Sequence, residues 1–366
     1  MAESTRLVEL VQESIDRFLD RQEPHLRGIS DDLMPYLDFS RALLQGGKRF
    51  RALFCYWGWK STVGPHDADA DDSLRAAIGA ASALELFHAA ALVHDDIIDN
   101  SDTRRGRPSA HRRFESLHSE YSWAGDAEAF GRSGALLLGD LLLGFSDELL
   151  DEALWSLPDR ERAASARREF NRMRTEVTYG QYLDVLEERS WHTRDEDELS
   201  ERAHRVIVYK SAKYSIEAPL AIGAAIGGAS IGQLAALRDF GLPLGVAYQL
   251  RDDLLGVFGD PGITGKPAGD DLREGKRTVL IALARTKLPR NASRLLDELL
   301  GDPELTAQQV SMLQASIREC GAVEQVERII EHNVSKATAA LSQAPISPEA
   351  HTELTALAAT VSHREF

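Results

Sequence analysis

The sequence predicts an all-α protein with a single domain, residues 1–366, built from roughly a dozen helices. Apolar residues recur at helical spacing, as Leu7, Val11 and Phe18 do on one face of the first segment. No alternating strand pattern or Asn-Gly hairpin signal appears, and the apolar runs are too long to be strands bounded by turns. The apolar fraction of 43% is large enough to bury a core.

The predicted helices follow one another along the whole chain. After the N-terminal segment come a long apolar-biased run at 76–98 and a leucine-rich run at 136–150. Pro219, Pro243 and Pro289 are expected to kink or split three of the later runs. These later runs occupy 160–186, 201–227, 231–258, 279–300, 307–319 and 323–341.

Polar connections separate the helices, and 259–277 has the densest cluster of Gly and Pro. No connection is typical of a domain linker, because apolar helices that need packing partners flank each one. The other polar connections lie at 65–72, 99–108, 118–133 and 190–199.

The chain carries 42 Lys and Arg against 58 Asp and Glu, a formal net charge of −16. We therefore expect no nucleic-acid partner and no broad anionic-membrane surface. Cys55 and Cys320 are too few for a disulfide framework, and no Cys/His cluster suits zinc. The start lacks a secretory apolar region, and the most apolar stretch, 218–231, is shorter than a membrane span. We expect no transmembrane segment and a cytoplasmic protein.

Two acidic clusters follow apolar helical runs. Asp95 and Asp99 in HDDIIDN are four residues apart, so they share a helix face, where like charges repel unless a cation neutralises them. Oxygen-only ligands suit Mg²⁺. The second cluster, Asp252 and Asp253, is weaker, because Gly256 stands four residues after Asp252. Each cluster alone is equally typical of a solvated, capped or salt-bridged helix end.

Cations beside Gly turns and acidic clusters are the usual partners of phosphate, although any one of them alone is typical of a solvated surface charge. Neither a nucleotide P-loop nor a GxGxxG motif after a strand is present. His94 is compatible with a base, but a supporting or helix-terminal role is at least as well motivated. The cations are Lys48, Arg49, Arg51, Arg104, Arg105, Lys210, Lys213, Lys266, Lys276 and Arg277.

Seven motifs together resemble the trans-type polyprenyl diphosphate synthases, in particular the geranylgeranyl diphosphate synthases. They occur in that family's order and cover most of the chain. The resemblance implies an isoprenoid-synthase bundle around a deep central cavity, usually homodimeric. The motifs are GGKRFR (46–51), LFHAAALVHDDIIDNSDTRRG (86–106), LLLGDLLL (136–143), YGQYLD (179–184), YKSAKY (209–214), YQLRDD (248–253) and TGKPAGDDLREGKRT (264–278).

The resemblance also implies roles for individual residues. The diphosphate of isopentenyl diphosphate would be held by Lys48, Arg51, His88 and Arg105. The allylic diphosphate would be gripped by Arg104, Lys210, Ser211, Gln249 and Lys266, with Lys276 as an additional contact. Two Mg²⁺ ions would bind Asp95 and Asp99, with Asp96 in support, and a third would bind Asp252 with Asp253. The catalytic residues would be Asp95, Asp96, Asp99, Arg104, Lys210 and Asp252.

The implied reaction is a Mg²⁺-dependent condensation of isopentenyl diphosphate with an allylic diphosphate of the C5–C15 class. The allylic C–O bond ionises, the double bond of isopentenyl diphosphate attacks the cation, and a proton is lost, for which we favour the leaving diphosphate as acceptor. Water must be excluded, and 259–277 is a candidate lid. Gly256 departs from the family pattern by lacking the third carboxylate. Two alternatives follow: Asp260 compensates through water, or the third metal ion relies on Asp252 alone. Ala52 replaces a usual Pro, with little expected consequence.

Small residues before the first acidic cluster set the expected product length. Ala91 and Ala90 lie four and five residues before Asp95, where bulky aromatics shorten the product in this family, and Phe87 is a candidate floor. We therefore expect geranylgeranyl diphosphate (C20). The alternative is that the alanines only permit close helix packing.

Three other classes share part of this pattern. A class I terpene cyclase would explain one acidic motif, but its second metal motif is not seen near Asp252, and it does not need GGKRFR or His88. A head-to-head synthase also lacks GGKRFR. A noncatalytic helical subunit of a heteromeric synthase would be expected to lose metal carboxylates, whereas the first set here is complete.

Overall fold

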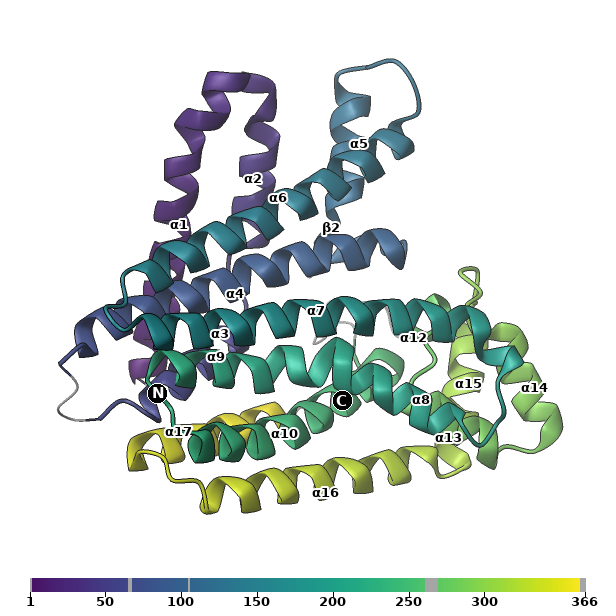
Figure 1. The fold of residues 1–366 in the computed structure, drawn as a ribbon. Coiled ribbons are helices and arrows are strands. Elements are labelled where there is room, and N and C mark those ends of the chain that lie inside the picture. The colour runs from purple at the N-terminus through teal and green to yellow at the C-terminus, as the bar shows by residue number, and fades with distance from the viewer. Residues whose placement is uncertain (1, 65–67, 105, 261–268, 363–366) are drawn as a thin grey trace. The chain divides into compact units, whose positions relative to one another are not determined.

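The computed structural model describes residues 2–64, 68–104, 106–260 and 269–362, and these are helical almost throughout (Figure 1). The predicted all-α class is confirmed. Within the described ranges the strands are β1 (Thr103–Arg104) and β2 (Arg107–Pro108), a short antiparallel ribbon inside the predicted 99–108 connection. Two-residue strands are too short to leave an alternating pattern in the sequence.

The chain forms two compact units. The first comprises residues 1–167 and 219–229, and the second comprises residues 168–218 and 230–366. α7 (Arg160–Ser190) and α9 (Ala218–Ile226) each contain a boundary between the units.

The first unit is organised around α4 (Ala70–Ile98), which packs on α1, α3, α5 and α6. Close approach of α4 and α6 depends on two glycines. A Cβ atom on Gly79 would lie 2.4 Å from the Ala153 Cβ, and one on Gly139 would lie 2.2 Å from the His94 Nε2. These contacts show that the two helices run antiparallel. The other helices of this unit are α1 (Ala2–Ile29), η1 (Asp31–Leu33), α2 (Met34–Leu43), α3 (Phe50–Lys60), α5 (Ala110–Glu120) and α6 (Ala127–Trp155).

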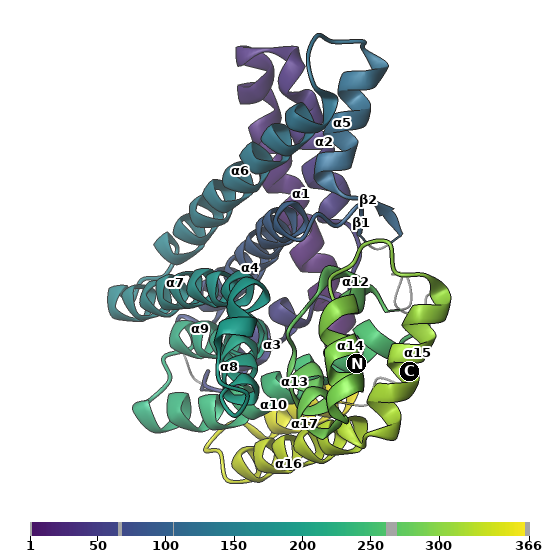
Figure 2. The same cartoon turned by 90° about the vertical axis from the view of Figure 1, so that its right-hand side faces the viewer.

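The second unit is organised around α10 (Ile231–Phe258). It begins at a capping box in which Ser230 and Gln233 each satisfy the other's backbone N–H. α16 (Ala322–Ser342) runs along α10 in both views (Figure 1 and Figure 2), and η3 (Ile207–Glu217), α12, α13 and α17 also contact α10. The remaining helices are η2 (Trp191–Thr193), α8 (Leu199–Val206), α12 (Asp270–Glu274), α13 (Val279–Lys287), α14 (Arg290–Leu299), α15 (Ala307–Glu319) and α17 (Pro348–Ser362).

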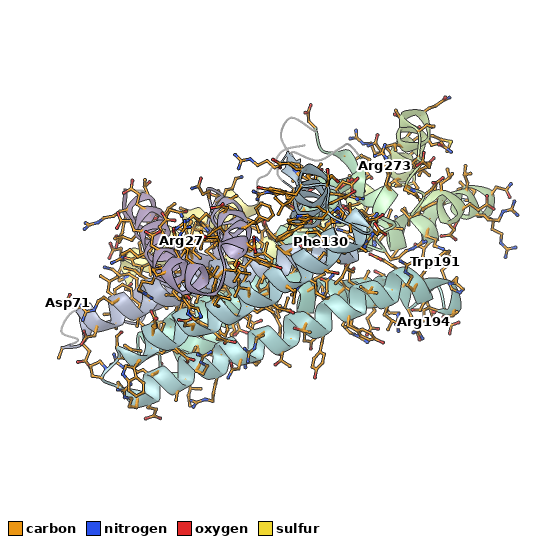
Figure 3. All side chains as sticks on the ribbon, turned by 90° about the horizontal axis from the view of Figure 1, so that it is seen from above. Arg27, Asp71, Phe130, Trp191, Arg194 and Arg273 are labelled. Atoms are coloured by element: carbon orange, nitrogen blue, oxygen red, sulfur yellow. The ribbon has the colours of Figure 1, made fainter. Side chains whose placement is uncertain are left out.

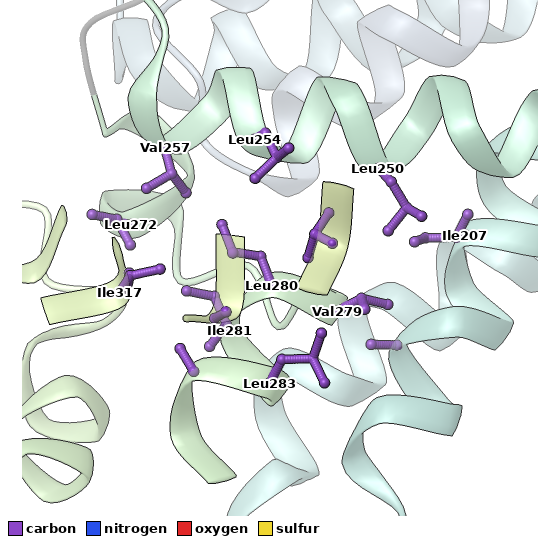
Figure 4. Packing of buried hydrophobic residues seen from close by; sticks show 14 of the residues in the cluster. Ile207, Leu250, Leu254, Val257, Leu272, Val279, Leu280, Ile281, Leu283 and Ile317 are labelled. Atoms are coloured by element: carbon purple, nitrogen blue, oxygen red, sulfur yellow. The ribbon is translucent and has the colours of Figure 1, made fainter. Parts of the chain in front are cut away.

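Apolar side chains of α10 and α13 form much of the core of the second unit (Figure 4). Leu250, Leu254 and Val257 lie on one face of α10, toward Leu280 and its neighbours on α13. α15 contributes Ile317 to the same cluster (Figure 4). The burial fixes the face of α10 that points inward and therefore the face on which its polar residues lie.

The three prolines expected to disturb helices behave differently. Pro289 separates α13 from α14, as predicted, whereas Pro243 lies inside an uninterrupted α10. Pro219 lies at the start of α9, just after η3. The predicted run 201–227 is one continuous stretch whose middle, η3, is π-helical over 11 residues.

One helix in the described part of the chain, α4, is long and apolar enough to cross a membrane by length and composition. Its most apolar window is 78% buried. Such burial is what the core helix of a globular protein shows, so the membrane signal is weak.

Candidate active site

One face of α4 carries the predicted site residues at helical spacing. His88, Ala91, Asp95 and Asp99 follow at steps of three and four residues, and each is partly exposed. The prediction that Asp95 and Asp99 share a face is therefore confirmed, since the helix continues to Ile98 and Asp99 closes it by donating its N–H to the Asp95 carbonyl. The buried positions between them are Ala89, Ala90, Val93 and Asp96.

Arg104 lies against the buried carboxylate of Asp96. Its Nε donates to Asp96 Oδ1 at 2.8 Å, its Nη2 donates to the same oxygen, and its Nη2 reaches Asp95 Oδ2 at 3.5 Å. Asp96 is only 1% exposed, so the guanidinium compensates a charge that solvent hardly reaches. This position suits the supporting role predicted for Asp96, and it makes Arg104 a partner of the first acidic cluster.

The described residues predicted to hold isopentenyl diphosphate all belong to the first unit. Lys48 is exposed in the loop after α2, Arg51 is partly buried in the first turn of α3, and His88 is partly exposed on α4. The loop turns through left-handed backbone at Gly46 (φ 73°) and Gly47 (φ 85°), which glycine adopts without a Cβ penalty. The three cationic or polar groups thus come from a tight turn and from two helices, α3 and α4, that pack on each other.

His94 is directed at α6. Its Nε2 lies 3.3 Å from the Leu136 carbonyl oxygen and 3.5 Å from Asp140 Oδ1, and the ring fills the space left by Gly139. Of the roles open to His94, the structure favours helix packing over proton abstraction.

Asp253 is the buried carboxylate of the second acidic cluster, on the last turns of α10. It is 5% exposed, its Oδ1 accepts a 2.8 Å hydrogen bond from Gln249 Nε2, and its Oδ2 has no hydrogen-bond partner among the described residues. Burial raises the pKa of Asp253 well above its usual value; the Gln249 hydrogen bond lowers this pKa, and the charges of Asp271 and Asp252 raise it. Asp252, the preceding residue, is exposed. A buried oxygen without a partner is a position where a cation would be stabilising.

Gly256 lies directly beneath a carboxylate from another helix. A Cβ atom on Gly256 would lie 2.0 Å from Asp271 Oδ2, and Asp271, on α12, is only 9% exposed. The missing side chain at Gly256 therefore leaves room for Asp271. Sequence reasoning gave Asp271 no role, although it lies within the motif TGKPAGDDLREGKRT, and it proposed the exposed Asp260 instead.

The π-helix η3 presents Lys210, Ser211 and Lys213. Lys210 Nζ lies 2.5 Å from Asp184 Oδ2, and Lys213 Nζ lies 3.0 Å from both oxygens of Glu176, so both lysines pair with carboxylates of α7. π-Helical turns are rare and occur often at functional sites. Sequence reasoning missed Asp184, although the motif YGQYLD ends at it.

Two cations at the end of the polar 259–277 segment have carboxylate partners nearby. Lys276 Nζ lies 2.8 Å from Glu274 Oε2, and Arg277 stacks 3.8 Å over the Trp191 ring and reaches Asp297 Oδ1 at 3.5 Å. Trp191 lies just beyond the end of α7 (Figure 3). Burial lowers the pKa of Arg277 to about 10, which leaves the group protonated at neutral pH. We assign Arg277 a structural role.

Some predicted features lie outside the described residues. These are Arg105, Lys266 and the middle of the candidate lid, 261–268. The two acidic clusters belong to different units, Asp95 and Asp99 to the first and Asp252 and Asp253 to the second. That the two clusters bind metal ions of one common site stays a prediction.

The donor chemistry fits a hard divalent cation. The candidate ligands are carboxylate oxygens, and Asp253 Oδ2 is buried without a hydrogen-bond donor among the residues that the structure describes. In the described part of the chain no three His, Cys, Asp or Glu side chains are arranged as a metal cage. An ion held by one or two carboxylates together with substrate phosphates does not require such a cage.

A solved structure shares the all-α fold that carries these carboxylates and cations, and it places the chain in the isoprenoid synthase class. A geranylgeranyl pyrophosphate synthase from Corynebacterium glutamicum, complexed with isoprenyl diphosphate and magnesium, superposes with a TM-score of 0.91 at 38% identity, covering 98% of this chain and 99% of that one.

Sequence comparisons identify the family. The polyprenyl synthetase family model matches residues 36–317. A geranylgeranyl diphosphate synthase of Mycobacterium tuberculosis is 31% identical over 90% of this chain and 83% of its own length. A geranylfarnesyl diphosphate synthase of Aeropyrum pernix is 31% identical over 82% of this chain and 84% of its own. The chain belongs to the polyprenyl synthetase family and is a prenyltransferase of the short-chain isoprenyl diphosphate synthase type, which confirms the resemblance drawn from the seven motifs.

Proposed function

We propose that the protein condenses isopentenyl diphosphate with an allylic diphosphate of the C5–C15 class, with Mg²⁺, to give geranylgeranyl diphosphate (C20). The observation that carries this proposal is one partly exposed face of α4, here called the α4 stripe. His88, Ala91, Asp95 and Asp99 follow one another along it, with the two carboxylates at the C-terminal end of the helix. A carboxylate pair at one end of a partly exposed helix face suits a substrate with an anionic head and a growing apolar tail.

The chain's own residues divide between the two substrates. Lys48, Arg51 and His88 bind the diphosphate of isopentenyl diphosphate and orient its double bond. Lys210 and Arg104 bind the allylic diphosphate, helped by Ser211 and Gln249. Because Arg104 contacts Asp96 and Lys210 contacts Asp184, these cations are held in fixed positions before a diphosphate shares them.

Charge moves toward the allylic diphosphate as the reaction proceeds. The allylic C–O bond breaks with its electron pair on oxygen, the double bond of isopentenyl diphosphate supplies the pair for the new C–C bond, and the departing diphosphate accepts the proton released from C2. Cations placed at the departing oxygen interact more strongly with this state than with the bound substrate, which is what lowers the barrier. When bound, magnesium neutralises the diphosphate and makes it a better leaving group.

The metal complement is proposed as three ions. Asp95 and Asp99 would hold two of them, and Asp252 with Asp253 would hold the third. The carboxylate of Asp271 adjoins this second cluster at the place where a side chain on Gly256 would stand, so the cluster keeps a third acidic group.

The product length follows from the α4 stripe. Ala91 lies about 6 Å along the helix axis from Asp95, at ~1.5 Å per residue, and presents only a methyl group. Phe87, 4% exposed, lies one turn further, and Ala90 is fully buried within the helix packing. The tail therefore passes Ala91 before meeting a bulky residue, which favours C20 over shorter products.

Further proposals concern the whole molecule. Residues 1–366 form one polyprenyl synthetase domain, which is supported by a family match that crosses both units. The protein is a cytoplasmic homodimer without a nucleic-acid partner. Leu136 and Leu137, 51% and 57% exposed on α6, are apolar surface of the kind that a subunit interface covers. Light scattering in solution tests the dimer.

The direct test of function is incubation with isopentenyl diphosphate, Mg²⁺ and each of the C5, C10 and C15 allylic diphosphates in turn. Chromatography of the dephosphorylated products should show the C20 alcohol, and EDTA should abolish it. A cyclic hydrocarbon would instead indicate a class I terpene cyclase. The absence of any prenyl alcohol would indicate a noncatalytic subunit.

A further inference from the structure

Arg49 holds the loop between α2 and α3 in an unusual backbone conformation. Its φ is 50°, following Gly46 and Gly47, which also have positive φ. A non-glycine residue in the left-handed region is strained and persists only where its surroundings hold it. Lys48 and Arg51 are both proposed to bind isopentenyl diphosphate; Lys48 directly precedes Arg49, and Arg51 follows it by two residues.

The guanidinium of Arg49 joins three elements of the first unit. Nη1 donates to Glu85 Oε2 on α4 at 3.0 Å, and Nη2 donates to Gln12 Oε1 on α1 at 2.6 Å and to the Leu44 carbonyl at the end of α2. Gln12 in turn donates from Nε2 to Asp16, which orients its oxygen toward Arg49. The side chains of Arg49 and Glu85 are only 4% and 6% exposed.

Glu85 links Arg49 to the other two elements that carry proposed ligands of isopentenyl diphosphate, α3 and α4. Its second oxygen, Oε1, accepts the N–H of Ala52 at 3.4 Å, in a first turn of α3 that has no side-chain cap from its own N-cap residue. Glu85 also stands three residues before His88 on α4, on the same side of the helix. One carboxylate therefore joins the Lys48 loop, the start of α3 and the helix that carries His88.

Folding stability alone does not explain the buried ion pair of Arg49 and Glu85. Replacing a buried ion pair with apolar residues of similar volume is often neutral or stabilising, because desolvation offsets much of the attraction. What apolar residues cannot reproduce is the planar fork that fixes three acceptors at once. We propose that Arg49 and Glu85 are positioning residues for the isopentenyl diphosphate subsite, setting Lys48 and Arg51 relative to His88. The inference rests on the proposed function.

The test compares the two substrates in steady-state kinetics. Arg49→Lys keeps the charge and loses the fork, and we expect KM for isopentenyl diphosphate to rise about tenfold or more, as small misplacements of binding groups do. KM for the allylic diphosphate should stay within about twofold, because its proposed ligands contact neither residue. Calorimetric titration of isopentenyl diphosphate should show the same loss of affinity without turnover.

Two further variants separate positioning from folding. The double variant Arg49→Met with Glu85→Met should keep a melting temperature near that of the parent and still show the raised KM for isopentenyl diphosphate. Arg202→Lys alters a comparable Arg–Glu pair, Arg202 with Glu187 in the second unit, and should leave the ratio of the two KM values unchanged.

Each outcome decides a different question. A double variant with parental KM for isopentenyl diphosphate, or an Arg49→Lys variant in which both KM values rise together, overturns the positioning role while leaving the proposed function intact. A parent protein that forms no prenyl product overturns the proposed function, and the inference with it.

Discussion

The carboxylate of Asp271 occupies the space that a side chain on Gly256 would need, with its Oδ2 atom 2.0 Å from the position of a Cβ there. The two residues are on different helices, α10 and α12, which pack on each other. The departure of Gly256 from the family pattern is therefore accompanied by an acidic group at nearly the same place.

Restoring the family's carboxylate by Gly256→Asp is expected to harm the protein. The new side chain must displace Asp271, and overpacking of this kind costs about 1–3 kcal/mol of unfolding free energy. Urea unfolding measures the loss. The variant Gly256→Asp with Asp271→Gly should recover part of it; equal losses in the single and double variants would contradict a direct steric conflict.

Replacing Ala91 with Phe should shorten the product, because Ala91 lies on the partly exposed stripe with Asp95. Ala90, the other small residue before Asp95, is fully buried, so Ala90→Phe should mainly lower stability, by about 1–3 kcal/mol. Chromatography of the product alcohols and thermal unfolding distinguish the two effects. A C20 product from a folded Ala91→Phe variant would place the tail elsewhere.

Glu217 should make the stability of the protein depend on pH. Burial raises the pKa of Glu217, and its Oε2 has no hydrogen-bond partner among the described residues. Because the pKa of Glu217 is higher in the folded state than in the unfolded state, the protonated side chain stabilises the folded protein below pH 4.5, its ordinary pKa. This stabilisation is lost as the pH rises through the pKa that Glu217 has in the folded state.

Glu217→Gln removes this pH-dependent loss of stability, because glutamine does not ionise. The variant should unfold at a higher temperature than the parent at pH 8, by the equivalent of about 1 kcal/mol, and the gain should shrink as pH falls toward 4.5. Calorimetry across this range measures it. A gain that does not vary with pH would show that the ionisation of Glu217 is not the cause.

The two cysteines should differ in reactivity. Burial raises the pKa of Cys55 to about 12, and the residue is fully buried, whereas Cys320 is partly exposed. A chromogenic disulfide reagent at pH 8 should modify Cys320 in the folded protein and Cys55 only after denaturant is added. Cys320→Ser should abolish the early reaction. Rapid modification of Cys55 in that variant would indicate local opening of α3.

The sequence predicted the fold class and several helix bounds correctly because these depend on local signals. The bounds of α10, 231–258, were predicted to the residue, since Ser230 starts the helix and the Gly/Pro-rich segment follows it. Pro243 does not split this helix, because packing on both sides outweighs the loss of one hydrogen bond.

The partners of the site residues could not be predicted, because they depend on packing between distant segments. Asp184 lies 26 residues before Lys210, and Glu85 lies 36 residues after Arg49. The π-helical winding of η3 has no periodic signature in a segment of 11 residues. The motifs identified the candidate functional residues, whereas their carboxylate partners became visible only in the folded structure.

The left-handed backbone at Arg49 restricts which amino acids the chain can place there. Glycine and asparagine adopt this conformation readily but carry no guanidinium, while lysine brings a charge without the planar donors. The conformational and the chemical demand therefore conflict, and arginine meets the chemical one at the cost of a strained backbone. We would expect random mutagenesis of this loop to return active clones with changes at Gln45, an exposed residue without a proposed role, far more readily than at position 49.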